Sequence, residues 1–129
     1  MSNRRRSGVG NSYRRGYLRS RAWFARRDRW FRDERRKVGR LECAGCGGEA
    51  ATHDDLHHVN YSGVVQIAPD QWRAGEAHED LMVMHPACHE LLHRLIERDV
   101  VLARHKNRRK ANELALKQLH ALMARWKRS

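Results

Sequence analysis

The sequence predicts a small α+β fold, in which a core of short strands is flanked by an N-terminal and a C-terminal helix. Three observations support this prediction. Apolar residues recur at helical spacing near both ends, short β-like runs separated by glycines occupy the middle, and pairs of cysteine and histidine stand on either side of those runs. At 129 residues, the chain fits one domain with extensions.

Charge divides the chain into three parts. Residues 1–40 carry 15 basic and 3 acidic groups, residues 41–99 carry 3 and 11, and residues 100–129 carry 9 and 1, which gives the formal net charge of +12. The acidic middle also holds seven of the nine histidines and all three cysteines. Basic flanks attract polyanions, so we expect a partner with a phosphate backbone.

Composition also excludes several classes of protein. Three cysteines, two of them in a C-x-x-C, cannot form the paired framework of a secreted disulfide protein. No apolar run approaches the roughly 18 residues of a membrane span, and the charged N-terminus has no apolar stretch behind it as a secretory signal would. We therefore expect a cytoplasmic protein with no membrane partner.

The N-terminal part predicts an arm and a helix. Residues 1–16 are rich in arginine, glycine and serine, which predicts a disordered basic arm. Residues 17–40 predict an arginine-rich amphipathic helix from about Ser20 to Gly39, because aromatic and apolar residues recur at about seven-residue spacing. These residues are Trp23, Phe24, Trp30, Phe31 and Val38. The stripe should dock on the core, and the arginines between its members are the expected DNA-binding residues, namely Arg26, Arg27, Arg29, Arg32, Arg35 and Arg36.

Residues 41–99 predict the core. Short β-like runs are expected at residues 41–42, 56–61 and 64–67, followed by a polar loop at residues 69–79 and a short apolar run at residues 81–84. A helix is expected from about Cys88, because the residues after it form one apolar face. These residues are Leu91, Leu92, Leu95 and Ile96.

Residues 100–129 predict a basic C-terminal helix, running roughly from Lys106 to Trp126. Its apolar residues keep i, i+3 and i+4 spacing. We expect this stripe to complete the core, and binding to a partner helix is the alternative.

Two pairs of residues predict a structural zinc site. Cys43 and Cys46 have two residues between them, and the small residues around them let backbone N–H groups face the sulfurs. His85 and Cys88 repeat that spacing about 40 residues later, just before the expected helix. The four residues predict one structural Zn²⁺, which would stabilise so small a core. A redox pair, or two reduced thiols with an unrelated His-Cys, is the alternative.

Two pairs of histidines predict a second, open site. His57 and His58 are neighbours in a strand-like run, so their side chains point to opposite faces unless the strand bends. His89 and His93 stand at i and i+4 on one helix face, a spacing that lets two imidazoles bind one ion. Unrelated surface histidines are the alternative.

In these residues the sequence resembles the HNH endonucleases, and more narrowly their zinc-containing branch. The matching motifs are Leu56-His57-His58-Val59-Asn60-Tyr61, the segment from Gly75 to Met84, and Cys88-His89 with His93. They cover about residues 41–95 and leave both basic parts outside. The resemblance implies a ββα-metal core, treble-clef-like and stabilised by zinc, that hydrolyses phosphodiester bonds of DNA, with double-stranded DNA as the foremost partner.

The resemblance also assigns roles by position. His58 matches the general base that takes a proton from the attacking water. His57, His89 and His93 match the ligands of one catalytic divalent metal, Mn²⁺, Ni²⁺, Zn²⁺ or Mg²⁺, that stabilises the leaving 3′ oxygen. Asp80 stands where the family has its middle asparagine, and would brace the loop and orient His58. His85 stands where a cysteine is usual.

The chemistry of these residues agrees with the implied reaction. Imidazole has an unperturbed pKa that suits a general base near neutral pH, and an open metal site supplies a Lewis acid. Two alternatives stay open. One is a non-catalytic, zinc-stabilised nucleic-acid-binding module. The other is a small nuclease component of a phage or mobile-element machine, which would need a protein partner, bound through the basic arms.

Overall fold

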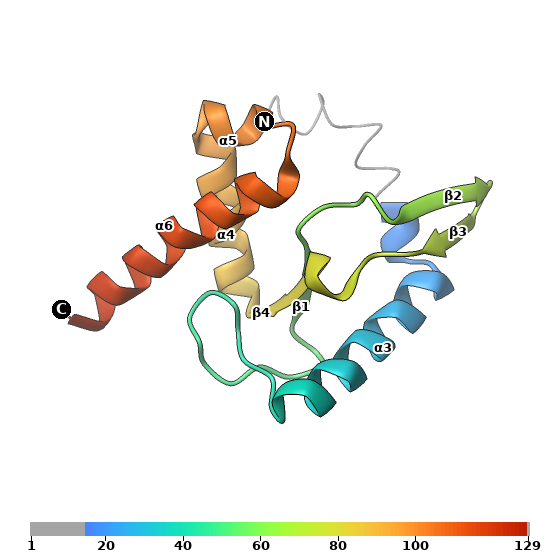
Figure 1. Ribbon diagram of the computed structural model, residues 1–129, viewed down its shortest axis with the longest axis horizontal. Helices are drawn as coiled ribbons and strands as arrows, with labels where there is room; N and C mark the ends of the chain where they lie inside the picture. Colours follow the sequence, from blue (N-terminus) through green and yellow to red (C-terminus); the bar gives the residue numbers. More distant parts are fainter. Residues whose placement is uncertain (1–14, 129) are drawn as a thin grey trace.

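The computed structural model describes residues 15–128 of the chain (Figure 1). The basic arm predicted for residues 1–16 lies outside the described residues, apart from Arg15 and Gly16, which belong to a helical turn over residues 15–18. None of the helices within residues 15–128 combines the length and the apolar character that a membrane crossing requires.

The chain forms a small α+β fold with two separate two-stranded antiparallel sheets, which agrees with the predicted fold class at that level of detail (Figure 1). The elements are α3 (Arg21–Val38), β1 (Asp55–His58), β2 (Val64–Ala68), β3 (Gln71–Ala74), η1 (His78–Asp80), β4 (Leu81–Met84), α4 (Pro86–Arg98), α5 (Val100–Arg104) and α6 (Arg108–Arg128). Strand β1 pairs with β4, and β2 pairs with β3.

Helix α3 forms where the aromatic stripe predicts it. Ser20 caps its N-terminus by accepting a hydrogen bond from the Trp23 N–H at 3.1 Å, and the helix ends before Gly39. Trp23 and Trp30 are buried, and the Trp30 indole donates to the His78 carbonyl at 3.0 Å. The aromatic face therefore docks the helix on the core, as expected.

Two members of the predicted stripe do not join the buried face of α3. Phe24 and Val38 are each 54% exposed. Phe24 follows Trp23 directly, and the rotation of about 100° between neighbours in a helix turns it away from the part of the core that Trp23 contacts. Val38 is the last residue of α3, beyond the part that packs against the core.

Strand β1 carries His57 and His58, and helix α4, which follows the neighbouring strand β4, carries Cys88, His89 and His93. The two strands pair along their whole lengths. Helix α4 starts at Pro86, slightly before the expected Cys88, because proline suits the first turn, where its missing N–H costs nothing. Leu92 and Ile96 on its apolar face are buried, as predicted.

The C-terminal part contains two helices where one was expected. The short helix α5 was not predicted, and Asp99 caps it by accepting hydrogen bonds from the N–H groups of Val101 and Leu102. Helix α6 lies close to the predicted range and packs against α4. Its stripe, which includes the buried Ala115 and Leu119, completes the core as predicted, except for Trp126 at its end, which is 57% exposed.

The predicted polar loop at residues 69–79 is wrong in its first half, which forms strand β3. This strand pairs with β2 across a turn at Asp70, whose φ is 62°. Trp72 packs against the core, whereas Gln71 and Arg73 on either side of it are exposed. A polar composition hides the strand, because only alternate residues of a strand face the core.

A close approach of two backbones fixes the chain after β3. The Gly75 N–H donates to the Gly63 carbonyl at 2.8 Å, and a Cβ on Gly63 would collide with the Gly75 carbonyl. Only glycine fits there. The contact places Glu76, the next residue, within hydrogen-bond distance of His58.

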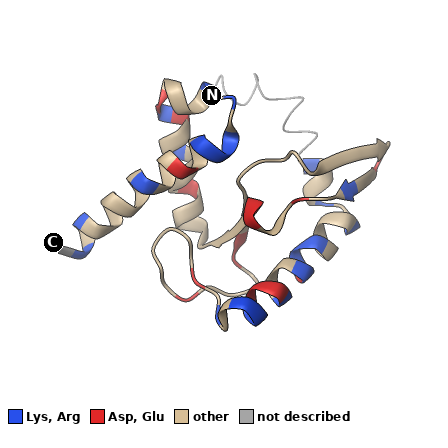
Figure 2. Ribbon diagram, in the orientation of Figure 1, with Lys and Arg blue, Asp and Glu red and all other residues tan. Residues whose placement is uncertain are grey.

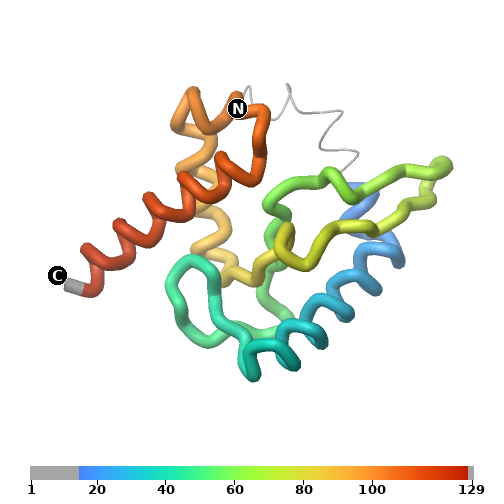
Figure 3. The backbone as a smooth tube through the Cα atoms, viewed as in Figure 1, coloured from blue at the N-terminus to red at the C-terminus, as the bar shows by residue number. Residues whose placement is uncertain are grey.

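The core consists of two clusters that β4 connects. Val83 belongs to the cluster that also holds the aromatic residues of α3, whereas Met84 belongs to the cluster of α4, α5 and α6. The backbone trace shows the loop after α3 folding back beside the start of α4 (Figure 3). Basic residues gather along α3 and at the two ends of α6, on either side of these clusters (Figure 2).

Candidate metal centres

Three cysteines and one histidine meet at the start of α4. The loop after α3 supplies Cys43 and Cys46, and the junction of β4 and α4 supplies His85 and Cys88. Their ligand atoms all lie within 4.8 Å of one another, so this Cys3His cluster could bind a metal ion such as zinc. Two sulfurs on one tetrahedral zinc ion would be separated by about 3.8 Å, which is compatible with that spacing.

Backbone N–H groups surround the sulfurs of the Cys3His cluster. The Cys43 sulfur faces the N–H groups of Gly45 at 3.4 Å and His85 at 3.3 Å, and the Cys46 sulfur faces the Gly48 N–H at 3.4 Å. Burial raises the pKa of Cys43, but hydrogen bonds from the N–H groups of Cys46, His85 and Gly45 outweigh burial and leave the pKa below its ordinary value. The surroundings of Cys43 therefore favour the thiolate.

Cys88 and His85 complete the donor set. Burial and then the neighbouring sulfurs of Cys43 and Cys46 raise the pKa of Cys88 to about 12, because adjacent thiolates repel without a cation. His85 places Nδ1 3.2 Å from the Cys46 sulfur, while its Nε2 donates to the Glu49 carbonyl at 2.7 Å. A histidine ligand is commonly oriented by such a bond from its other nitrogen.

Gly45 is required for the compactness of this cluster. A Cβ added there would lie 2.9 Å from the Cys88 Cβ and 3.1 Å from a methyl group of Leu119. The small residues that the sequence shows between Cys43 and Cys46 thus serve close packing against α4 and α6, in addition to exposing N–H groups.

The second group of histidines also comes together, as the sequence predicts. His57 of β1 meets His89 and His93 of α4, and their ligand atoms lie within 4.8 Å of one another. His57 Nδ1 and His93 Nε2 lie 3.1 Å and 3.0 Å from His89 Nε2. Nitrogens bound to one tetrahedral ion would be about 3.3 Å apart, so this histidine cluster has the spacing of a metal site.

Two hydrogen bonds determine which nitrogens face one another in the histidine cluster. His89 Nδ1 lies 2.9 Å from Asp55 Oδ2, and His57 Nε2 lies 2.7 Å from Asn112 Oδ1. Both oxygens can only accept, so these nitrogens carry the protons in neutral rings. The unprotonated nitrogens, His57 Nδ1 and His89 Nε2, then face each other at 3.1 Å. Two lone pairs repel at that distance, and a bound cation would remove the repulsion.

His57 is neutral at physiological pH. Burial is the largest cause, and together with the neighbouring imidazoles of His89 and His93 it lowers the pKa of His57 to about 3, against the opposite effect of the Asn112 hydrogen bond. Metal binding requires unprotonated imidazole, so no proton has to leave His57 before an ion binds.

His58 points to the other face of β1, as strand geometry predicts. Its ring stacks on Tyr61, with centroids 4.0 Å apart and an angle of 10° between the ring planes. The ring centroid of Trp23 lies 4.6 Å from that of His58. Its Nε2 lies 2.7 Å from Glu76 Oε2. Both histidines nevertheless line one pocket of about 410 Å³, here called the histidine pocket. Its lining residues are Arg15, Leu18, Leu56, His57, His58, Tyr61, His89 and His93.

The Asp80 side chain meets Arg109 rather than His58. It is buried, and both of its carboxylate oxygens accept hydrogen bonds from Arg109 of α6 at 2.7 Å. Its carbonyl accepts from the Val59 N–H at 2.8 Å, so Asp80 does hold the loop against β1. The carboxylate that meets His58 belongs to Glu76 instead.

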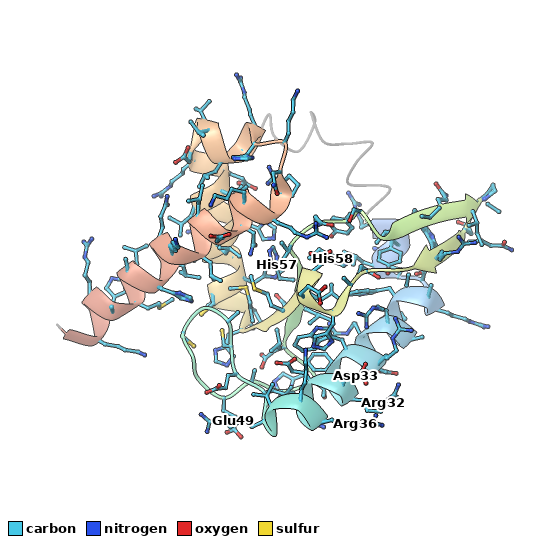
Figure 4. All side chains as sticks on the ribbon, in the orientation of Figure 1. Arg32, Asp33, Arg36, Glu49, His57 and His58 are labelled. Carbon is cyan, nitrogen blue, oxygen red and sulfur yellow. The ribbon has the colours of Figure 1, made fainter. Side chains whose placement is uncertain are left out.

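The predicted DNA-binding arginines of α3 differ in their surroundings. Arg26 is only 4% exposed and donates to the Glu76 carbonyl, so it is not available to DNA. Arg27, Arg32 and Arg35 line a second pocket of about 440 Å³, which shares no lining residue with the histidine pocket. Figure 4 shows Arg32 and Arg36 turned away from His57 and His58.

Sequence reasoning missed three residues that support the histidines. Asp55 stands two residues before His57, and this spacing on a strand places both on one face, which is a usable signal. Asn112 is a polar residue directly beside Ala111 on the buried side of α6, which is a weaker signal. Glu76 lies in a polar segment that carries no such pattern.

The comparisons with known proteins identify no relative. No family model matches the chain, and neither a curated protein nor a solved structure matches it.

Proposed function

We propose that the protein is a metal-dependent endonuclease of the HNH type, which hydrolyses phosphodiester bonds of DNA. One observation carries this proposal. Three imidazoles with the spacing of a metal site and a fourth imidazole with a carboxylate partner line the same pocket. Hydrolysis of a phosphodiester needs these two components, a cation and a base, close to one phosphate.

In the proposed reaction each histidine of the histidine pocket has one task. His58 takes a proton from the water that attacks phosphorus. His57, His89 and His93 hold a divalent ion, and Asp55 and Asn112 keep two of these rings in the required orientation. The ion, when bound, would supply the Lewis acid that stabilises charge on the phosphate and on the leaving 3′ oxygen.

We further propose that β1, β4 and α4 form a ββα-metal unit, with the Cys3His cluster as a treble-clef-like zinc site. The arrangement of ligands supports this. Both clusters draw ligands from the first three turns of α4, since Cys88 belongs to one and His89 and His93 to the other. The zinc ion would therefore fix the helix that positions the catalytic metal.

The ligand set predicts which metals support cleavage. Nitrogen ligands suit transition metals and zinc better than magnesium, which prefers oxygen. We expect Mn²⁺, Ni²⁺ or Zn²⁺ to support nicking of supercoiled plasmid at least as well as Mg²⁺, measured with protein that retains its structural zinc but has been dialysed free of other metals. His93→Ala should weaken the response to Mn²⁺. Activity with Mg²⁺ alone would contradict the proposed ligand set.

The exposed arginines of α3 are proposed to bind the phosphate backbone away from the cleaved bond. Replacing Arg32 and Arg36 together by alanine should weaken DNA binding several-fold. The plot of the logarithm of the association constant against the logarithm of the salt concentration should also become shallower, by about 2 in the magnitude of its slope, because about one counterion is released per phosphate contact. Fluorescence anisotropy over a salt series measures this slope. The cleavage rate at saturating DNA should stay unchanged, since both side chains lie apart from His57 and His58 (Figure 4). Unchanged affinity would instead indicate that this face meets a protein partner.

A further inference from the structure

Glu76 is a buried carboxylate that contacts the proposed base directly. Its Oε2 lies 2.7 Å from His58 Nε2 and accepts a hydrogen bond from the Tyr17 hydroxyl at 2.6 Å. The side chains of Glu76 and His58 are 0% and 3% exposed. A carboxylate so far from water is held there by specific partners, since burying an unpaired charge is costly.

The backbone around Glu76 is held in place from two sides. Arg26 donates from Nε and Nη2 to the Glu76 carbonyl at 3.1 Å and 2.9 Å, and its guanidinium lies 3.9 Å from Glu76 Oε1. The contact of Gly63 with Gly75 fixes the preceding residue. Among the described residues, Glu76 Oε1 and Arg26 Nη1 have no hydrogen-bond partner, so the structure retains an incompletely satisfied buried pair to keep this carboxylate.

Charge and tautomer follow from these contacts. Burial raises the pKa of Glu76, but the hydrogen bonds from His58 and Tyr17 outweigh it and keep the pKa below its ordinary value. Burial and the adjacent Glu76 raise the pKa of Tyr17 far above its ordinary value, so the phenol stays protonated and donates. An ionised carboxylate only accepts, and therefore neutral His58 carries its proton on Nε2.

The ring of His58 also has little freedom to turn. Tyr61 stacks on one face of the ring. The ring centroids of Trp23 and Tyr17 lie 4.6 Å and 6.0 Å from the His58 centroid, and Tyr17 meets the His58 ring edge-on. A ring held between aromatic side chains, with Nε2 bound to Glu76, presents a single nitrogen for proton transfer. That nitrogen is Nδ1.

We propose that Glu76 is the positioning residue of the reaction, and that it holds His58 with Nδ1 as the proton-accepting atom. This inference rests on the proposed nuclease function. As the water oxygen bonds to phosphorus and the bond to the 3′ oxygen breaks, the water proton moves to Nδ1 and a solvent proton neutralises the 3′ oxygen. The imidazolium that forms is stabilised by the Glu76 carboxylate, in the way that a base is generally oriented by a third group.

Two variants separate this role from a purely structural one. Glu76→Gln keeps the size and one acceptor oxygen but removes the charge, and should lower kcat about 100-fold with KM for DNA within two-fold of wild type. Glu76→Asp should restore part of the rate. Glu34→Gln is the matched control, because Glu34 forms an equally short bond with His78, at 2.7 Å, outside the histidine pocket. It should leave kcat unchanged.

A measurement without DNA tests the same claim. Nitrogen NMR of histidine-labelled wild-type protein loaded with zinc should show His58 with its proton on Nε2. A proton on Nδ1, or a Glu76→Gln variant that cleaves at the wild-type rate, would overturn the proposal. A wild type that cleaves no DNA with any divalent ion would refute the nuclease function instead, and the tautomer would still show whether Glu76 holds His58.

Discussion

His58→Ala should reduce metal-dependent plasmid cleavage by about 10² to 10⁴-fold, the usual contribution of a positioned general base. The loss should appear in kcat, because the ring lies below the surface of the histidine pocket, only 3% of it exposed, and contributes little to DNA binding. Cleavage of supercoiled plasmid in the presence of Mn²⁺ measures the rate, and retention on DNA measures binding.

Two further variants make the His58 experiment interpretable. His58→Ala leaves the buried Glu76 without one of its hydrogen-bond donors, and this could unfold the protein. His58→Gln keeps an N–H group, so a loss of cleavage in this variant reports the loss of the base rather than unfolding. His53→Ala is the control, since the His53 side chain is 85% exposed and lies outside the pocket, and it should cleave like wild type. A wild type that binds DNA but never nicks it would favour the non-catalytic binding module.

Removal of the structural metal should unfold the protein. Zinc bound to such a site contributes an apparent free energy of roughly 10–16 kcal/mol, which equals or exceeds the roughly 5–15 kcal/mol by which small domains are stable. We therefore expect Cys43→Ala, and strong chelation of wild type, to abolish cooperative thermal unfolding as followed by circular dichroism.

The matched control for the zinc experiment comes from the other cluster. His93 is exposed, and His93→Ala removes a ligand from the histidine cluster only, so the variant should melt like wild type and retain one zinc ion by elemental analysis. A chelated sample that holds no zinc and still melts at the original temperature would contradict the structural role of the Cys3His cluster.

The parts of the site that the sequence predicts are those encoded by local spacing. Cys43 and Cys46 are close in the chain, and His89 and His93 share a helix face, so each half of a cluster is visible before folding. His57 and His58 diverge because neighbours in a strand alternate, which is also a local rule.

The residues that hold the histidines depend on contacts between distant segments. Glu76 is 18 residues from His58, and Asn112 is 55 residues from His57. No spacing rule joins such positions, and the polar segment that contains Glu76 also hides strand β3. The prediction that Arg26 binds DNA is wrong for a related reason. An arginine on an amphipathic helix is expected to be solvent-exposed, and the sequence does not show the buried Glu76 carbonyl that accepts its hydrogen bond.

Helix α6 determines how far toward the C-terminus a shortened chain must extend to keep the contacts that support both candidate metal sites. Its Asn112 forms a hydrogen bond with His57, its Arg109 pairs with Asp80, and its His120 donates to the Ala44 carbonyl between Cys43 and Cys46 at 2.8 Å. A truncated chain that ends with the predicted core at residue 99 would keep every proposed metal ligand yet lose Asn112, which orients His57, together with the contacts of Arg109 and His120. The basic C-terminal helix is thus part of the proposed catalytic unit, and a shortened chain that keeps these contacts has to reach at least to His120.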